Sequence, residues 1–489
     1  MDRKAFLKYT GAGAGFLLTP SVITSCINAS SNESDIYRYP LRFPDTLDSD
    51  QLRASRDDLT IAEQYTLDSL QFNGSLPGPT VRIKRGEQFQ VQFQNDIGQE
   101  SIIHWHGMIV PPDMDGHPKD VISEGSYSYN FTINQRAGTY WYHPHPHKIT
   151  GPQVYRGLAG FFIVTDEEEQ ALNLPSGDYE LPLVIQDRKI DDTGNIYYNP
   201  TMPERMMTGY LGDHILVNGV PNPYHEVQPR PYRLRLLNGS NARIYNIAFR
   251  NEQSFTVIGS DGGLLPQPVE TTELLLAPGE RADILVDFSN GFSGSSAELI
   301  SKEFSVPSNG GMMGNMSQMM GGGGPEQGSE FPLMEFRIDS TSGTSSSINL
   351  PQQLSEVNFP TEDDAVRTRR IELNMEMMTG HTINGRLFEM LRVDEEVTQG
   401  DSEIWEFVNN SAVPHPMHIH AVQFKVLSRS GSRGLLPTET GWKDTTLVMP
   451  GERVSVIMRF DAPKGLYVFH CHNLEHEDAG MMANLEIVQ

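Results

Sequence analysis

Four His-x-His pairs constrain this 489-residue chain more than any other feature of its sequence. They hold eight of its 15 histidines: His104 and His106, His143 and His145, His418 and His420, and His470 and His472. In an extended strand, residues i and i+2 face the same side, so each pair offers two imidazoles to one face. One such pair is most simply two surface histidines, but four pairs are difficult to explain in that way. Because imidazole binds copper, zinc, iron and nickel, the pairs predict a metal site.

The last pair encloses Cys471, one of only two cysteines. If residues 470–472 are extended, the thiol faces away from the two imidazoles, and one strand joins two metal sites. Cys471, His476 and Met481 have the spacing of a blue-copper site, which uses one Cys, two His and a weak axial Met. His415 is the best candidate for the second histidine. Zinc would also accept Cys and His, although a structural zinc site needs neither the Met nor the paired histidines.

Short stretches of alternating apolar and polar residues predict an all-β fold. The segments 80–96, 233–250 and 452–460 alternate in this way and are separated by Gly, Pro and Asn turns. Long amphipathic helices are absent from the sequence. Many short strands of this kind favour β-sandwiches or barrels.

Two breaks in the strand pattern predict three β domains, at 45–170, 171–345 and 346–489. The breaks lie at 168–176 and in the Ser-rich segment 340–356. The predicted second domain also contains a Met/Gly-rich stretch at 309–328, with Met312, Met313, Met316, Met319 and Met320. We expect this stretch to be a mobile loop, because a Gly-rich segment is poorly suited to burying thioethers in a fixed core.

The N-terminus predicts export. Residues 1–26 open with the basic pair Arg3 and Lys4, continue with a short apolar run, and end in "ITSC", which resembles a bacterial lipobox. Lipidation of Cys26 would leave 27–44 as a tether and place the protein in the periplasm, in contact with a membrane only through the lipid. An ordinary secretory signal with an incidental Cys26 is the alternative. No other apolar run reaches the length of a membrane span.

The formal net charge of −26 argues against nucleic acid as a partner, because phosphate backbones require a basic face. It is compatible with cationic substrates, or with a solvated acidic surface.

Several longer motifs resemble those of the multicopper oxidases, the family of laccases, cuprous oxidases and bilirubin oxidases. They include "HWHGMIVPPDMDG", "TYWYHPHPHKITGPQVYRGLAGFFIV", "GWKDTTLVMPGERVSVIMRF" and the C-terminal "HCHNLEHEDAGMM". The similarity covers nearly all of the chain after the export signal and is greatest to the bacterial periplasmic cuprous oxidase and laccase branch. It implies three cupredoxin-like β domains, in agreement with the domain count above.

The resemblance also implies four copper ions. The type 1 copper would be held by His415, Cys471 and His476, with Met481 axial. The type 2 copper would take His104 and His418. One type 3 copper would take His106, His143 and His472, and the other His145, His420 and His470. The other histidines, expected to form hydrogen bonds or lie at the surface, are His117, His147, His214, His225 and His381, with His147 the best candidate for supporting a ligand.

Such an oxidase would pass electrons from the type 1 copper through Cys471 to His470 and His472, and reduce O₂ to water. Asp115 and Glu477 match carboxylates that supply protons in the family. The reductant stays open between Cu(I), with a role in copper tolerance, and phenols. Ser411 and Val413 stand where cuprous oxidases place their substrate ligands, but the Met-rich stretch could replace them.

The sequence leaves two other functions open. A copper-sequestering periplasmic lipoprotein with little turnover is the main alternative. Two-domain copper nitrite reductases fit less well, because they lack the ligands of the trinuclear cluster. We expect a monomer.

Overall fold

Strands form where the sequence alternates. In β4 (Gln88–Asn95), Phe89, Val91 and Phe93 are buried, whereas the glutamines between them are exposed. One face of this strand therefore packs on a core and the other meets water. By contrast, β9 (Glu180–Arg188) and β13 (Pro231–Asn238) are buried along their whole length, because one face packs on the second core and Val184 and Leu237 of the other face pack on side chains of the first domain.

The computed structural model describes residues 36–62, 65–289, 296–307, 324–339, 348–376, 379–431 and 433–489, and those from Tyr37 onward form one unit. The α-helices in these ranges are short: α1 (Thr150–Tyr155), α2 (Glu167–Ala171), α3 (Met202–Met206) and α5 (Leu474–Asp478). The described ranges contain no helix with the length and apolar character that a membrane crossing requires.

The first eight strands form two four-stranded sheets. Their bounds are β1 (Gln51–Ala62), β2 (Tyr65–Phe72), β3 (Gly78–Lys84), β4 (Gln88–Asn95), β5 (Ile103–His106), β6 (Gly125–Thr132), β7 (Gly138–Pro144) and β8 (Gly160–Thr165). The strand orders are β2-β1-β4-β6 and β3-β8-β7-β5. Side chains from both sheets, including Phe93 and Trp105, form the first hydrophobic core.

The middle strands form a seven-stranded and a five-stranded sheet. Their bounds are β9 (Glu180–Arg188), β10 (His214–Val217), β11 (Val220–Pro221), β12 (Tyr224–Val227), β13 (Pro231–Asn238), β14 (Tyr245–Phe249), β15 (Phe255–Ser260), β16 (Gly263–Thr271), β17 (Glu273–Leu276), β18 (Arg281–Asp287), β19 (Ser296–Ser301) and β20 (Phe331–Ile338). The orders are β11-β10-β9-β13-β18-β15-β16 and β12-β20-β19-β14-β17. Both sheets contribute to the second core.

The last strands form two five-stranded sheets. Their bounds are β21 (Ala365–Glu376), β22 (Gly380–Ile383), β23 (Glu395–Thr398), β24 (Ser402–Asn409), β25 (His415–Ile419), β26 (Phe424–Ser430), β27 (Thr445–Val448), β28 (Arg453–Arg459), β29 (Gly465–Cys471) and β30 (Met482–Val488). The orders are β22-β21-β24-β28-β26 and β23-β30-β29-β25-β27. The third core lies between them.

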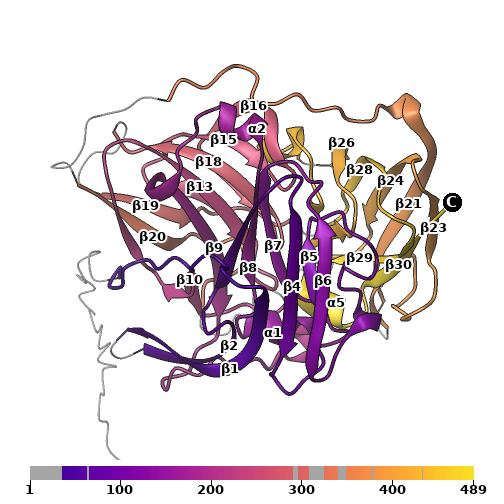
Figure 1. Cartoon of the computed structure of the whole chain (residues 1–489), viewed down its shortest axis with the longest axis horizontal. Helices are drawn as coiled ribbons and strands as arrows, with labels where there is room; N and C mark the ends of the chain where they lie inside the picture. The colour runs from indigo at the N-terminus through magenta and orange to yellow at the C-terminus, as the bar shows by residue number, and fades with distance from the viewer. Residues whose placement is uncertain are drawn as a thin grey trace, which may run out of the picture. The chain divides into compact units, whose positions relative to one another are not determined.

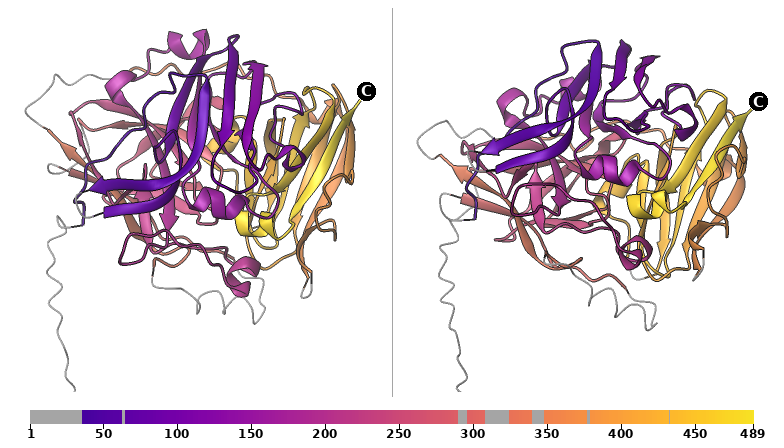
Figure 2. Two further views of the ribbon diagram at one scale, coloured as in Figure 1. Left: turned by 60° about the horizontal axis from the view of Figure 1, so that its bottom comes forward. Right: turned by 90° about the horizontal axis from the view of Figure 1, so that it is seen from below.

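Three domains of two packed sheets each confirm the predicted all-β, cupredoxin-like fold. In Figure 1 the strands of the third domain, orange to yellow, gather on the right, and those of the second domain lie on the left. The views in Figure 2 keep the third domain on the same side. The domain limits at 170 and 345 fall between β8 and β9 and between β20 and β21.

The described part of the predicted tether at 27–44 packs on the second domain instead of standing free. Tyr37 and Leu41 are buried, and the Leu41 N–H donates to the Tyr224 carbonyl at 2.7 Å. Because these apolar side chains gain burial against the second domain, residues 37–44 belong to the folded unit. The predicted export signal at 1–26 lies outside the described residues.

Helix α5 ties the three domains together. It belongs to the third domain and packs against α1 of the first (Figure 1). Asp478 of α5 accepts the backbone N–H groups of Thr150 and Gly151 at 3.0 and 2.9 Å. Glu475 accepts from the Tyr198 hydroxyl and the Asn241 amide of the second domain, at 2.9 and 3.0 Å. These bonds hold the helix between its neighbours.

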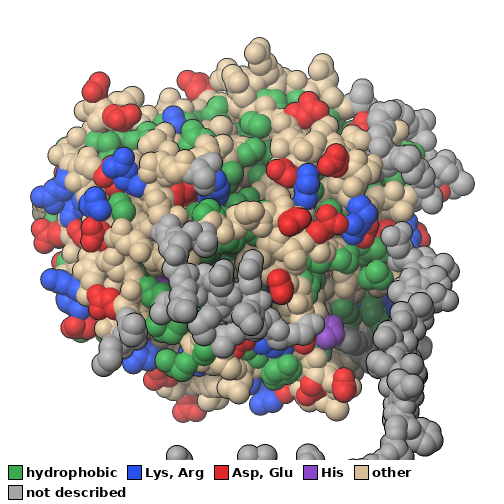
Figure 3. All heavy atoms as spheres, turned by 180° about the vertical axis from the view of Figure 1, so that it is seen from behind, with side chains coloured by type: hydrophobic (Ala, Val, Ile, Leu, Met, Phe, Trp, Pro, Cys, Tyr) green, Lys and Arg blue, Asp and Glu red, His purple; other side chains and the backbone are tan. Residues whose placement is uncertain are grey.

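Acidic and basic side chains are interspersed over the face drawn in Figure 3. This mixture is typical of a solvated surface, although the whole chain carries a formal charge of −26.

Candidate metal centre

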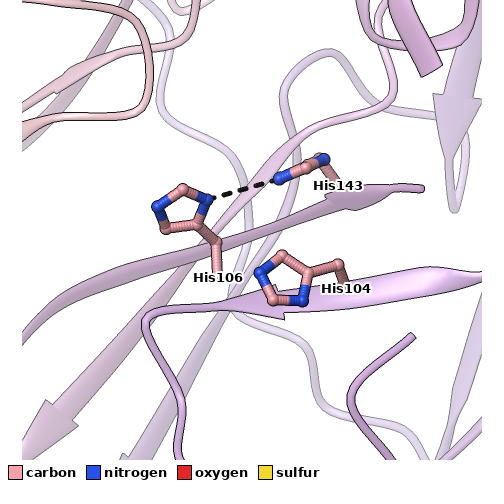
Figure 4. Close-up of side chains that lie close together, drawn as sticks. All are labelled: His104, His106 and His143. Atoms are coloured by element: carbon pink, nitrogen blue, oxygen red, sulfur yellow. Dashed lines mark hydrogen bonds between the residues drawn. The ribbon is translucent and has the colours of Figure 1, made fainter. Parts of the chain in front are cut away.

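The first two histidine pairs come from neighbouring strands. In the antiparallel β5–β7 ladder, His104 lies opposite His143, so both imidazoles leave the same face. Trp105, between His104 and His106, points the other way into the first core. Figure 4 shows the three rings, with His106 Nδ1 at 3.4 Å from His143 Nε2. The alternation that the sequence predicts is therefore present.

The other two pairs come from the third domain. In the β25–β29 ladder, His418 lies opposite His470, and Met417 lies opposite Cys471. Cys471 and Met417 face the third core, whereas the imidazoles face away from it. One strand thus presents a thiol to one side and histidines to the other, as its sequence indicates.

The paired histidines meet between the first and third domains. All eight are fully buried, and we call them the eight-histidine cluster. His104 Nε2 lies 3.3 Å from His418 Nε2. The His472 ring lies 5.0 Å from that of His106 and 5.4 Å from that of His143, between ring centroids.

A second group of three rings completes the cluster. His470 Nε2 lies 3.2 Å from His145 Nε2 and 3.2 Å from His420 Nε2. His145 belongs to the first domain and the other two to the third. The cluster therefore exists only where both domains are in place.

In six of the eight rings, one nitrogen, which we call the outer nitrogen, is hydrogen-bonded to an oxygen atom. The pairs are His104 Nδ1 with Asp115 O (2.7 Å), His143 Nδ1 with Pro144 O (2.9 Å), His418 Nδ1 with Asp444 O (2.9 Å), His470 Nδ1 with Cys471 O (3.1 Å), His420 Nδ1 with Asp115 Oδ2 (2.8 Å) and His106 Nε2 with Asp444 Oδ1 (3.0 Å). Carbonyls and carboxylates only accept, so these nitrogens carry the hydrogen and the inner nitrogens present lone pairs.

Converging lone pairs fit a set of metal ions. Two ligand nitrogens bound at about 2.0 Å with a tetrahedral angle lie about 3.3 Å apart. The inner nitrogens lie 3.2 to 3.4 Å apart, where lone pairs repel unless a cation separates them. Neither ring nitrogen of His472 has a hydrogen-bond partner among the described residues. The donor set therefore suits metal rather than a hydrogen-bond network.

Asp115 and Asp444 support the cluster from outside. Asp115 lies on a loop that passes close to β5. Gly116 makes this approach possible, because its φ is +82° and a Cβ there would lie 2.2 Å from the Ile103 carbonyl oxygen. Asp444 is paired with Arg281, whose Nη1 and Nη2 lie 2.7 and 2.5 Å from its carboxylate oxygens. Sequence reasoning found Asp115 but not Asp444.

His415, Cys471, His476 and Met481 form a second buried group, which we call the Cys471 site. His415 Nδ1 and His476 Nδ1 lie 3.4 and 3.6 Å from Cys471 Sγ. The backbone N–H of Cys471 donates to the Met481 carbonyl at 3.1 Å, and the Met481 N–H donates to the His476 carbonyl at 2.9 Å. The side chain of Met481 is fully buried in the same core as Cys471.

The outer nitrogens of this site are also occupied. His415 Nε2 lies 2.8 Å from Ser411 Oγ, and His476 Nε2 donates to the Met207 carbonyl at 3.2 Å. Both Nδ1 atoms are thereby left facing the thiol. Ser411, which the resemblance marked as a departure from cuprous oxidases, holds a candidate ligand in position.

Burial favours the neutral form of six of the cluster imidazoles, and metal binding requires neutral imidazoles. Desolvation, and then repulsion between neighbouring rings, lowers the pKa well below its usual value for His106, His143, His418, His420 and His472. Desolvation also lowers the pKa of His145 to about 3. Burial raises the pKa of the Cys471 thiol, so a thiolate there needs a bound cation.

Glu477 is the second predicted carboxylate, and it lies beside the cluster. Its oxygens are 3.7 Å from His145 Nε2 and 3.1 Å from His470 Nδ1. Burial alone would raise the pKa of Glu477, but hydrogen bonds from His470 and Thr150 to its carboxylate oppose this effect, and the pKa lies below its usual value. Glu477 is therefore an anion next to rings of both domains.

Among the remaining histidines, His381 rather than the predicted His147 lies against a candidate ligand. His147 is half-buried and packs on Phe388, at 5.1 Å between ring centroids. His381 contacts the Cys471 site instead, with its ring 3.9 Å from that of His476. No sequence signal separated His381 from the others, because it stands alone. Met312, Met313, Met316, Met319, Met320 and Cys26 lie outside the described residues.

The chain is similar to known proteins in both sequence and structure. Family models for multicopper oxidases match residues 54–169, 191–295 and 359–489. The laccase of Bacillus subtilis (strain 168) is 33% identical, over 85% of this chain and 89% of its own length. The crystal structure of the multicopper oxidase McoA from Aquifex aeolicus is 40% identical, with a TM-score of 0.81 over 92% of this chain and 100% of that one. A multicopper oxidase from Campylobacter jejuni, described as a metallo-oxidase, is 27% identical with a TM-score of 0.80, over 94% of this chain and 97% of that one. The chain belongs to the multicopper oxidase family.

Proposed function

We propose that this protein takes single electrons from a small reductant and uses them to reduce O₂ to water. The observation that carries the proposal is the position of Cys471. Its thiol lies in one site, while its neighbours His470 and His472 lie in the other. Copper bound at these sites would supply the one-electron chemistry and the place where O₂ reacts. A few covalent bonds of the backbone then link electron entry to O₂ reduction.

We assign the ligands to four copper ions, supported by the distances between ring nitrogens, by the ring of His472 beside His106 and His143, and by the distances to Cys471 Sγ. In the Cys471 site, His415, Cys471 and His476 would hold the type 1 copper, with the buried Met481 as a candidate further ligand. His104 and His418 would hold the type 2 copper. The two type 3 coppers would take His106, His143 and His472, and His145, His420 and His470.

Two buried carboxylates would handle protons. Asp115 Oδ1 makes no hydrogen bond within the described chain, while Oδ2 accepts from His420 Nδ1 at 2.8 Å. Oδ1, which lies 3.5 Å from His104 Nδ1, is therefore the oxygen that would carry a proton beside the cluster. Glu477, which faces His145 and His470, would receive protons on the other side.

The reductant is either Cu(I), with a role in copper tolerance, or a phenol. The name laccase for the Bacillus subtilis relative favours phenols, and the description metallo-oxidase for the Campylobacter jejuni protein favours a metal ion. The Ser411 hydroxyl is a hard donor that is engaged with His415, and the Val413 side chain has no donor atom, so neither offers the soft ligand that Cu(I) prefers. A cuprous activity would therefore need thioethers from elsewhere in the chain.

Oxygen consumption separates these functions. The copper-loaded protein is given Cu(I), then a phenol, and O₂ uptake is followed with the Cys471→Ser variant as control. We expect uptake with at least one donor and none with the variant. A protein that holds its copper but consumes O₂ with neither donor would be a copper-sequestering protein, and the proposal would be wrong.

A further inference from the structure

His381 lies against the Cys471 site without belonging to any of the four pairs. It sits on β22, is fully buried, and has a ring 3.9 Å from that of His476 at an interplanar angle of 37°. Its ring is also 5.0 Å from that of His415. One nitrogen from each of these three histidines lies within 4.8 Å of the others. The ring therefore covers a face of His476.

Two consecutive backbone carbonyls of the second domain hold the rings of His381 and His476. The Met206 carbonyl accepts from His381 Nε2 at 2.9 Å, and the Met207 carbonyl accepts from His476 Nε2 at 3.2 Å. Gly380, the neighbour of His381, also lies against the Met206 side chain, because a Cβ there would be in van der Waals contact with Met206 Sδ at 3.4 Å. The end of α3 thus holds His476 directly, through the Met207 carbonyl, and indirectly, through His381.

We propose that His381 is a positioning residue for the electron-entry site, which fixes the plane of His476 and keeps water from its face. This inference rests on the proposed assignment of a type 1 copper to His415, Cys471 and His476. An oxidised copper site carries one more positive charge than its reduced form, and water stabilises the added charge. Excluding water beside the ligand therefore favours the reduced form and raises the reduction potential.

Three variants separate the ring from its hydrogen bond. His381→Phe keeps an aromatic ring and loses the donor to Met206, His381→Gln keeps a donor and loses the ring, and His381→Ala loses both. The midpoint potential of the blue copper is measured by equilibrium with a redox mediator. His225→Ala is the matched control, because His225 is a half-buried ring of the second domain that packs on Phe43.

We expect the blue absorption to persist in all variants, because no ligand is removed. His381→Ala should make the site about tenfold easier to oxidise, which is about 59 mV for one electron. His381→Gln should shift the equilibrium in the same direction, and His381→Phe by less than twofold. The rate at which O₂ reoxidises the reduced cluster should not change, whereas a general loss of structure would lower it.

An unchanged or raised potential in both His381→Ala and His381→Gln would overturn the proposal. If His381→Ala does not fold, the other two decide: a larger shift for His381→Phe than for His381→Gln contradicts water exclusion by the ring. A parent protein that is copper-loaded but not blue would instead refute the type 1 assignment itself, and the inference with it.

Discussion

Asp115 and Asp444 hold the eight-histidine cluster reciprocally across the boundary between the first and third domains. Each aspartate uses its backbone carbonyl for a histidine of its own domain, His104 or His418, and its carboxylate for one of the other domain, His420 or His106. The two differ in their remaining oxygens. Asp444 is locked by Arg281, whereas Asp115 Oδ1 has no hydrogen-bond partner among the described residues. This difference suits Asp444 for support and Asp115 for proton transfer.

Asp115→Asn should slow the reoxidation of the reduced protein by O₂ about 100-fold or more, within the usual range for loss of a general acid. Reduction of the type 1 copper should be little affected, because the Cys471 site is untouched. Stopped-flow measurement of the two half-reactions checks this. Asp113→Asn, an exposed neighbour on the same loop, serves as control. Equal slowing of both half-reactions would give Asp115 a structural role.

Asp444→Asn should lower the free energy of unfolding by about 3 kcal/mol, because it leaves the buried Arg281 without its closest counter-charge. His106 also loses its carboxylate partner, so the cluster should retain less copper. Chemical denaturation and metal analysis measure the two effects. Asp461→Asn breaks an exposed pair with Arg459 and should cost less than about 1 kcal/mol. Similar costs for both substitutions would contradict the support assigned to Asp444.

The metal-free protein should lose stability as the pH falls below about 6.5. The folded pKa values of His106, His143 and His145 lie below the unfolded value, so the unfolded chain binds protons that the folded chain does not. Their contribution is complete above the unfolded pKa and is lost as the pH falls toward about 3 for His145. Each such histidine adds up to about 1.4 kcal/mol per pH unit to the slope.

Denaturant titrations of the metal-free protein from pH 7 to 4 test this dependence. His145→Asn should have a shallower slope, because one titrating group is removed. A free energy of unfolding that stays constant over this range would show that the cluster imidazoles are not held neutral.

Cys26→Ser should release the protein from the membrane fraction, because a lipid on Cys26 is the anchor that the sequence predicts. Cell fractionation of parent and variant measures this. A variant that stays in the membrane fraction would refute the lipid anchor, and a parent found only in the soluble fraction would favour the ordinary secretory signal.

The fold and the metal-facing residues could be predicted because they rest on local periodicity. A two-residue repeat places His104 and His106 on one face and Trp105 in the core, and the same rule separates Cys471 from His470 and His472. Spacing also singled out His476. These inferences need neighbours in the sequence only, which is why they could be made without coordinates.

The supporting residues could not be predicted because they depend on distant contacts. Asp444 meets Arg281 across 163 positions, and His381 meets the Met206 carbonyl across 175. An isolated aspartate or histidine carries no periodic signal. Ser411 was noted as a departure from a motif, but its bond to His415 follows only from the turn that brings them together.

Copper analysis of the parent protein and Cys471→Ser tests whether Cys471 serves one copper site while its neighbours His470 and His472 serve another. Copper per chain is measured together with the blue absorption and the electron paramagnetic resonance spectrum. The account predicts about four coppers and a blue protein for the parent. It predicts about three coppers, no blue absorption and an intact type 2 signal for the variant, because serine supplies no thiolate while the eight histidines remain. A variant that stays blue, or one that folds but loses all its copper, would contradict it.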